Sequence, residues 1–109
     1  FKTNSMQSKL LTLAKKVFEI ESREIANLSN QLTDSFSKAV KSISCSDGKV
    51  ILIGMGKSGI IAKKIAATFA STGVPSFFMH PGEAYHGDLG MIEPRDIAIL
   101  LSNSGETDE

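Results

Sequence analysis

Apolar residues in the first third of the chain recur at the spacing of one helical face. Residues 1–47 contain neither glycine nor proline, and their apolar positions follow an i, i+3, i+4 period. The positions are Leu10, Leu11, Ala14, Val17, Phe18, Ile20, Ile25, Leu28, Leu32, Phe36, Ala39, Val40 and Ile43. The pattern predicts a helix from about Met6 to about Ser44, with a candidate break at the polar cluster Glu21–Asn30. The helix could simply be solvated. Part of it could instead pack on another subunit, because one short chain cannot cover so long an apolar stripe.

Three short apolar runs in the rest of the chain are typical of buried parallel strands. They predict strands at about Val50–Gly54, Ser76–Met79 and Ile97–Leu101, and the last, being continuously apolar, is expected to be buried. The order helix, strand, helix, strand, loop, strand predicts an α/β domain with a parallel sheet. Three strands and one crossover helix would leave a sheet face bare. We therefore expect the chain to be a piece of a longer protein.

A second helical pattern lies between the first two strands, at about Ser58–Ser71. Ser58 is the predicted N-cap and Gly73 the predicted C-cap. The face toward the sheet is predicted from the apolar positions Ile61, Ile65, Ala66 and Phe69, while Lys63 and Lys64 point outward. After the second strand, the segment His80–Met91 is predicted as a glycine-rich loop, and residues 93–96 as a turn.

Composition narrows the range of partners. Twelve basic and twelve acidic residues give a formal net charge of zero, which argues against a nucleic acid or a membrane surface as a partner. No apolar run approaches the ~20 residues that a membrane span needs. The lone Cys45 cannot form an internal disulfide, which suits a cytoplasmic protein.

The turn at residues 54–59 carries the most specific pattern. Its G-x-G-x-x-G spacing between a strand and a helix matches the dinucleotide fingerprint. That fingerprint also requires an acid at the end of the second strand, where Met79 and His80 stand, so a nicotinamide cofactor is disfavoured. A mononucleotide P-loop is excluded, since its first glycine would fall on Ile51. What remains is a glycine-rich turn whose Lys57 either meets a phosphate or a developing oxyanion or is solvated.

Three hydroxyl side chains follow the third strand at close spacing. They are Ser102, Ser104 and Thr107, and Gly105 between them lets a ligand approach the backbone. A helix beginning near Ser104 would add free N–H groups and complete a phosphate cradle. The alternative is ordinary N-capping, but one serine would satisfy a cap, so three hydroxyls at this spacing favour the cradle. Both this segment and the glycine-rich turn follow parallel strands, at the sheet edge where open α/β sheets bind ligands.

Acids and histidines stand close to the same sheet edge. Glu106, Asp108 and Glu109 could stabilise the start of a helix through its dipole, or one of them could serve as a general base. His80 and His86 could be proton shuttles, metal ligands or loop histidines bonded to the backbone. The residue pattern alone leaves these alternatives open.

Three stretches resemble the D-arabinose 5-phosphate isomerases of the sugar isomerase (SIS) domain superfamily. They read GMGKSG, ATFASTGVPSFFMHPGEAYHGDLGMI and LLSNSGETDE, and the similarity runs from about Lys49 to Glu109. The resemblance implies a three-layer fold with a five-stranded parallel sheet between helices, of which three strands are present. It divides the chain into residues 1–48, a helical segment packing on the SIS domain or a neighbouring subunit, and residues 49–109, the first half of that phosphosugar-binding domain.

The resemblance also implies a function. Members interconvert D-ribulose 5-phosphate and D-arabinose 5-phosphate through an enediol, the first step toward the lipopolysaccharide or capsule sugar Kdo. They require no cofactor, assemble as tetramers with shared active sites, and usually carry two CBS domains after the SIS domain. By this comparison the chain lacks part of the active site, and the isolated chain is expected to be inactive. A non-catalytic, regulatory phosphosugar-binding SIS module is the alternative.

Site residues follow from the resemblance position by position. The catalytic residues fall on Lys57, His86 and Glu109, the last in preference to Glu106. A divalent metal such as zinc can bind at the position of His80, although the chemistry does not require it. Substrate contacts fall on Gly56, Ser58, Gly73, Val74, His80, His86, Ser102, Asn103, Ser104, Gly105, Glu106 and Thr107. A second glutamate and a third histidine of the family would lie beyond Glu109.

Overall fold

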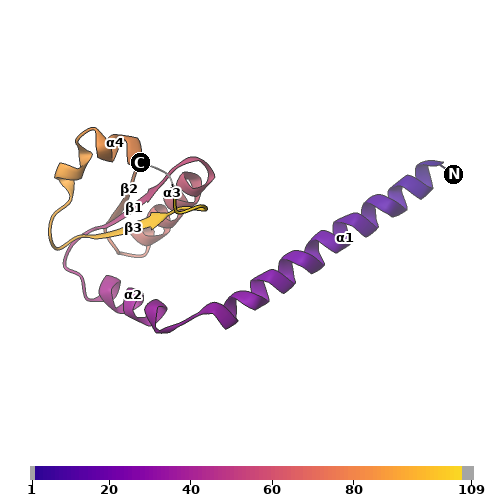
Figure 1. Ribbon diagram of the computed structural model, residues 1–109, viewed down its shortest axis with the longest axis horizontal. Coiled ribbons are helices and arrows are strands. Elements are labelled where there is room, and N and C mark those ends of the chain that lie inside the picture. The colour runs from indigo at the N-terminus through magenta and orange to yellow at the C-terminus, as the bar shows by residue number, and fades with distance from the viewer. Residues whose placement is uncertain (1, 107–109) are drawn as a thin grey trace. The chain divides into compact units, whose positions relative to one another are not determined.

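The computed structural model describes residues 2–106 of the chain, in two compact units that meet at residues 38 and 39. The first unit holds α1 (Lys2–Leu28), η1 (Ser29–Gln31) and the start of α2 (Asp34–Ser44). The second holds the end of α2 and all strands (Figure 1). Its elements are β1 (Val50–Gly54), α3 (Gly56–Ser71), β2 (Ser76–Met79), α4 (Pro81–Tyr85), η2 (Asp88–Met91) and β3 (Ile97–Leu101).

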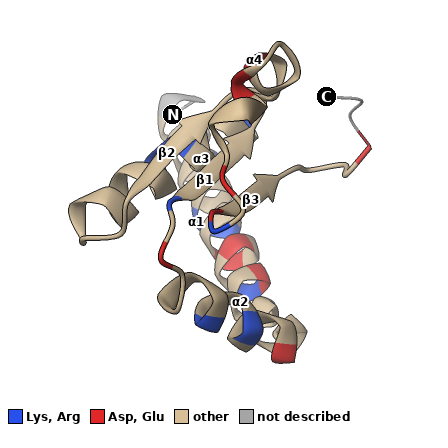
Figure 2. Ribbon diagram, turned by 90° about the vertical axis from the view of Figure 1, so that its left-hand side faces the viewer, with Lys and Arg blue, Asp and Glu red and all other residues tan. Residues whose placement is uncertain are grey.

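The helix α1 confirms the helical period of the first third of the chain. It continues to Leu28, and a 3₁₀ turn and the extended residue Leu32 then separate it from α2. The break therefore falls at the end of the segment in which it was predicted. The apolar stripe of α1 is exposed, with Phe18 72% accessible, and α1 carries both basic and acidic residues (Figure 2). Among residues 2–106, no helix is long and apolar enough to cross a membrane.

The sheet is parallel and has the strand order β2-β1-β3. Val50 lies opposite Ser76 on one side and Ile97 on the other, so all three strands end at the same edge. The central strand β1 is buried along its whole length. All three strands have the predicted bounds, because each is a short apolar run flanked by turn residues.

Alternate residues of β1 enter two separate core layers, as the two-residue period of a strand requires. Val50 and Leu52 pack with Ala62 and Ala66 of α3. Ile51 and Ile53 pack with Met79 and with Ala84 of α4. The sheet thus has α3 on one face and α4 on the other, which confirms the flanked parallel sheet expected from the sequence.

The buried face of α3 agrees with the predicted one at Ile65, Ala66 and Phe69, and differs from it at Ile61. Its buried residues are the small ones, Gly59, Ala62 and Ala66, whereas Ile61 is 54% exposed. The prediction for Ile61 was wrong because hydrophobicity was used to choose the face. The helix lies close to β1 at these small residues, and the larger Ile65 and Phe69 are partly buried against the same core layer.

The two ends of α3 also test the predicted caps. The helix begins at Gly56, the N-cap residue is Met55, and no side chain caps it. Ser58 is therefore inside the first turn and is not the N-cap. At the other end Gly73 has a φ of +93°, and the Val74 N–H donates to the Phe69 carbonyl at 2.9 Å. This is a Schellman ending and confirms Gly73 as the terminating glycine.

Two further predictions about the second unit were wrong. The strand β3 is half-exposed, with inward and outward residues alternating and Leu100 71% accessible. The reason is that the core layer on the α4 side does not extend over β3. The segment His80–Met91 is not a plain loop, since it contains α4 and η2. Pro81 at the first helical position favours α4 because its φ is already set for a helix.

A polar cluster joins the turns that precede β1 and β3. Both carboxylate oxygens of Asp96 accept backbone N–H groups at 2.8 Å, one from Glu93 and one from Lys49. The Lys49 ammonium adds an ion pair at 3.2 Å. The N–H groups of Glu93 and Lys49 lower the pKa of Asp96 from 3.8 to about 2. Gly48 has no room for a side chain, because a Cβ would lie 2.5 Å from the Arg95 carbonyl oxygen. The predicted turn at residues 93–96 is confirmed, and it fixes β3 against β1.

Candidate active site at the carboxyl edge of the sheet

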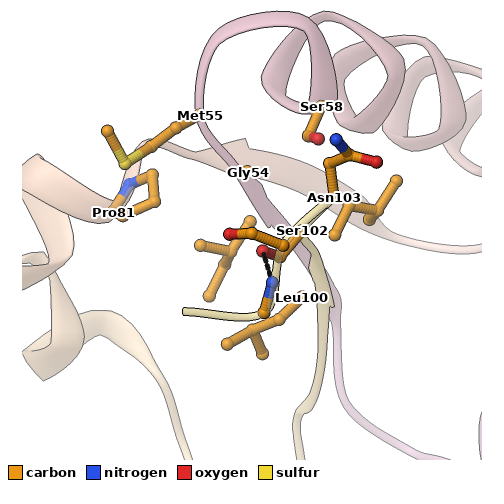
Figure 3. A pocket seen from close by; sticks show the side chains of 11 residues that line it. Gly54, Met55, Ser58, Pro81, Leu100, Ser102 and Asn103 are labelled. Atoms are coloured by element: carbon orange, nitrogen blue, oxygen red, sulfur yellow. Dashed lines mark hydrogen bonds between the residues drawn. The ribbon is translucent and has the colours of Figure 1, made fainter. Parts of the chain in front are cut away.

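A cavity of about 560 Å³ lies where β1 and β3 end, within the second unit (Figure 3). This is the edge at which open parallel sheets bind ligands, and the volume is within the usual range for small-molecule sites. The lining residues are Ile53, Gly54, Met55, Ser58, Pro81, Leu100, Leu101, Ser102, Asn103, Ser104 and Gly105.

Two glycines set the position of α3 beside this cavity. A Cβ at Gly59 would lie 2.7 Å from the Gly54 carbonyl oxygen, and a Cβ at Gly54 would lie 2.9 Å from the Ser58 carbonyl oxygen. Only glycine permits this approach, so the first turn of α3 lies directly beside the end of β1. The G-x-G-x-x-G pattern has a geometric role here, and it brings the Ser58 side chain into the cavity wall.

The segment after β3 is a hydroxyl-rich turn. Ser102 Oγ accepts the Gly105 N–H at 2.7 Å, and Ser104 Oγ accepts the Glu106 N–H at 3.2 Å. Gly105 has a φ of +72°, which favours glycine. A helix beginning near Ser104 would extend beyond Glu106, outside the described residues, and stays a prediction. Each hydroxyl still has its own O–H to donate to a ligand.

The cavity has a polar and an apolar side. In Figure 3 Ser58 and Asn103 lie on one side, and Met55 and Pro81 on the other. Hydroxyl and amide groups on one wall suit an anionic or polyhydroxylated ligand. Sequence reasoning missed Met55 and Pro81 as lining residues, although a signal was available. Met55 directly follows β1, and Pro81 stands two residues beyond the end of β2.

Lys57 and Gly56 lie beside the cavity and do not line it. Both belong to the first turn of α3, and both are exposed. With the other described residues, the Lys57 ammonium forms no hydrogen bond or ion pair. A cation on the helix turn next to a hydroxyl-lined cavity can bind an anion there. Its catalytic role stays a prediction.

The two histidines are at the two ends of α4. His80 is the N-cap residue, and its Nδ1 accepts the Gly82 N–H at 2.9 Å. His86 is the C-cap residue and is exposed, with its ring edge-on to Tyr85 at 5.8 Å between centroids. Neither ring lines the cavity. Pro81, which follows His80, does.

The described residues do not by themselves fit a zinc ion. In the part of the chain that the structure describes, no three His, Cys, Asp or Glu side chains are grouped to hold a metal. Because Nδ1 of His80 accepts an N–H, the neutral ring carries its proton on Nε2, the nitrogen left for a metal. A zinc ion at His80 therefore stays a prediction. It requires ligands from elsewhere and a move of that proton to Nδ1, which would break the bond from the Gly82 N–H.

Some predicted site residues lie away from the cavity or outside the described part. Gly73 and Val74 precede β2 at the opposite edge of the sheet, where the Pro75 carbonyl accepts the Val50 N–H at 2.9 Å. Val74 packs against the α3-side core. Their substrate contacts stay a prediction, and within this chain they are not brought to the cavity.

The acids and the last hydroxyl of the predicted site lie at the end of the chain. Glu106 is exposed at the end of the described turn. Thr107 and Glu109, predicted for phosphate binding and catalysis, lie outside the described residues. Their roles stay predictions.

The cavity, the flanked parallel sheet and the glycine-rich turn agree with a family comparison. Residues 42–109 match the family model described as SIS domain, and the chain belongs to the SIS-domain family. It is 57% identical over 95 residues to the arabinose 5-phosphate isomerase KdsD of Yersinia pestis, and 54% identical over 95 residues to KdsD of Escherichia coli K12. Each match covers 87% of this chain and 29% of the relative.

Solved structures extend the likeness to the fold. The c3406 protein of E. coli CFT073, solved in complex with arabinose 5-phosphate, has a TM-score of 0.83 and 49% identity, over 92% of this chain and 53% of that one. A putative phosphosugar isomerase involved in capsule formation from Bacteroides fragilis has a TM-score of 0.74 and 44% identity, over 88% of this chain and 53% of that one. The resemblance noted in the sequence is thereby confirmed. The chain spans less than a third of the length of the curated relatives that it matches.

Proposed function

We propose that the protein containing this chain is an aldose–ketose isomerase that interconverts D-ribulose 5-phosphate and D-arabinose 5-phosphate. The main support for this proposal is that the hydroxyl-rich turn after β3 and the start of α3 line one cavity of about 560 Å³. Its size is suited to a small molecule. Similarity to relatives named arabinose 5-phosphate isomerase supports the choice of substrate.

The phosphate group is held by the turn after β3. Ser102, Ser104 and Thr107 contribute hydroxyls, and the glycine at position 105 leaves the backbone approachable. The bonds from Gly105 to Ser102 and from Glu106 to Ser104 support this role, since they hold the turn closed. Asn103 and Ser58 contribute further donors to the sugar from the same cavity.

The reaction moves a proton between two neighbouring carbons. A base removes the proton on the carbon next to the carbonyl, an enediol or enediolate forms, and a proton is returned to the adjacent carbon. The reaction needs no external oxidant or reductant, because substrate and product are isomers. The base is either Glu109 or the second glutamate of the family, which would lie beyond it. Lys57 stabilises the developing oxyanion, and His86 assists ring opening or orientation. No cofactor is required in this scheme.

Assembly and pathway are proposals of the same kind. The exposed apolar stripe of α1 supports a homo-oligomer, for which we propose a tetramer. The lone, exposed Cys45 suits a cytoplasmic protein. The proposed pathway leads to Kdo, for lipopolysaccharide or for capsule. The Bacteroides fragilis neighbour, described as involved in capsule formation, supports such a pathway.

A turnover assay separates this proposal from a phosphosugar-binding regulatory module. The complete protein is incubated with D-arabinose 5-phosphate, ketose formation is followed by a coupled assay, and binding is measured separately by calorimetry. We expect both binding and turnover, and a Ser102→Ala variant should bind the phosphate more weakly. Binding without ketose formation would favour the regulatory module and contradict the isomerase.

A further inference from the structure

The ring of His80 is fixed to the first turn of α4. Its Nδ1 accepts the Gly82 N–H at 2.9 Å, so His80 serves as the N-cap. The ring also lies close over Gly82, where an added Cβ would be 3.1 Å from Nδ1 and 3.3 Å from Cε1. Two separate observations therefore place the imidazole against the backbone at the start of this helix.

The helix that His80 caps is too short to be stable alone. Five residues, Pro81–Tyr85, are far fewer than the ~12–15 that an isolated helix needs in water. Its stability depends on its cap and on the packing of its two buried residues, Pro81 and Ala84. Ala84 packs with Ile53 and Met79 in the core, while Pro81 lines the cavity.

The cap and the cavity wall are adjacent in the chain. His80 is the residue directly before Pro81, and its Nδ1 accepts the N–H of Gly82, the residue directly after Pro81. Loss of that bond would weaken the first turn of α4, which the Ala84 N–H bond to the His80 carbonyl at 3.0 Å also holds, and with it the wall that Pro81 forms. The nitrogen engaged in the cap is also withdrawn from a metal or a substrate.

We propose that His80 is a positioning residue, which acts through its Nδ1 cap on α4 to hold Pro81 in the wall of the sugar-phosphate cavity. The proposal rests on the proposed isomerase function. It assigns to His80 a role in binding affinity that requires neither contact with the substrate nor a metal.

A pair of amide substitutions distinguishes the two ring nitrogens. In His80→Asn, the side-chain Oδ1 takes the place of Nδ1, and Asn is among the best N-cap residues. In His80→Gln, the longer side chain places its amide near the former Nε2 and removes the cap. His80→Ala removes both groups, and Glu83→Gln on the same helix is the matched control.

The complete protein is examined in two ways. For D-arabinose 5-phosphate, we expect His80→Gln and His80→Ala to raise KM about three- to tenfold, the equilibrium factor that one helix cap is worth, with a smaller change in kcat. His80→Asn should restore most of the affinity that the Gln and Ala variants lose, and Glu83→Gln should leave KM unchanged. Amide hydrogen exchange at Gly82, Glu83 and Ala84 should quicken in the Gln and Ala variants and not in the Asn variant.

Each other outcome overturns the proposal. Retained KM in His80→Gln with a raised KM in His80→Asn would assign the role to Nε2, as for a ligand or metal contact. Equal changes of KM in His80→Asn and His80→Gln, or no change of KM in any variant, would show that the cap does not contribute to substrate binding. Absence of isomerase activity in the unaltered protein would contradict the proposed function. The rate of hydrogen exchange at the start of α4 would still show whether His80 stabilises that helix. Circular dichroism on every variant separates a folding defect from these results.

Discussion

The close approach of α3 to β1 predicts a large effect for the substitution Gly59→Ala. The added Cβ would lie 2.7 Å from the Gly54 carbonyl oxygen and 3.2 Å from its carbonyl carbon. Both facing atoms are backbone, so no rotamer change can relieve the overlap. The helix must move away by about 0.7 Å before the Cβ–oxygen distance reaches the 3.4 Å of an ordinary contact.

Two opposing terms set the size of the effect. Overpacking against rigid backbone costs about 2–3 kcal/mol, the upper part of the usual range. Alanine recovers about 1 kcal/mol through its better helix propensity. The net loss in the free energy of unfolding is therefore about 1–2 kcal/mol, or a decrease in Tm of roughly 2–8 °C for a complete domain of about 150–250 residues. The shifted start of α3 also displaces Lys57 and Ser58, which should lower kcat/KM on the order of tenfold to a hundredfold.

Urea unfolding and steady-state kinetics on the complete protein measure both quantities. Gly90→Ala is the matched control, because a Cβ there would meet no atom within 4 Å, and its stability should change by less than about 0.5 kcal/mol. A Gly59→Ala protein at least as stable as the unaltered one, with unchanged kcat/KM, would refute the reasoning. It would mean that this backbone contact does not position the first turn of α3.

Three further predictions concern single groups. Lys57→Ala in the complete protein should lower kcat by roughly 10²–10⁴-fold if the ammonium stabilises developing charge, and unaltered turnover would remove Lys57 from the mechanism. Asp96→Asn should lower Tm by several degrees, because the amide NH₂ then faces a backbone N–H. The pKa of Asp96 in the folded protein, about 2, lies below its ordinary value of 3.8. The carboxylate therefore contributes its full stabilisation above about pH 4 and loses it as the pH falls toward 2. An acid titration of Tm should show a steeper fall for the unaltered protein than for Asp96→Asn, and parallel curves would contradict this. Dialysis against a chelator should leave isomerase turnover unchanged, whereas lost turnover restored by zinc would make a metal at His80 necessary.

The glycine pattern at residues 54–59 predicted the local structure but not the kind of ligand that binds there. The G-x-G-x-x-G spacing indicated a sharp turn between a strand and a helix, and the chain does pass from β1 to α3 through Met55 alone. The same pattern could not distinguish a dinucleotide site from a phosphosugar site. The hydroxyls at Ser102 and Ser104 supported the second interpretation, because they follow a strand that ends at the same sheet edge.

Exposure was predicted less well than secondary structure. Ile61 and Leu100 were expected to be buried because they are apolar, and they are 54% and 71% exposed. Burial depends on which element lies opposite a side chain, and hydrophobicity alone does not specify that element. The small Ala62 takes part in the interface beside the correctly predicted Ala66, because the helix lies close to the strand there.

The sequence by itself determined the local structure of this protein. The strands β1, β2 and β3 have their predicted bounds, since apolar runs and turn residues act over a few positions. The family could also be recognised from the sequence, from GMGKSG and LLSNSGETDE. Only the tertiary structure decided that Met55 and Pro81 join the hydroxyl-rich turn in one cavity, and that His80 caps α4. Those relations join residues far apart in the chain or depend on side-chain geometry, and they form only once β1 is packed between its two neighbours.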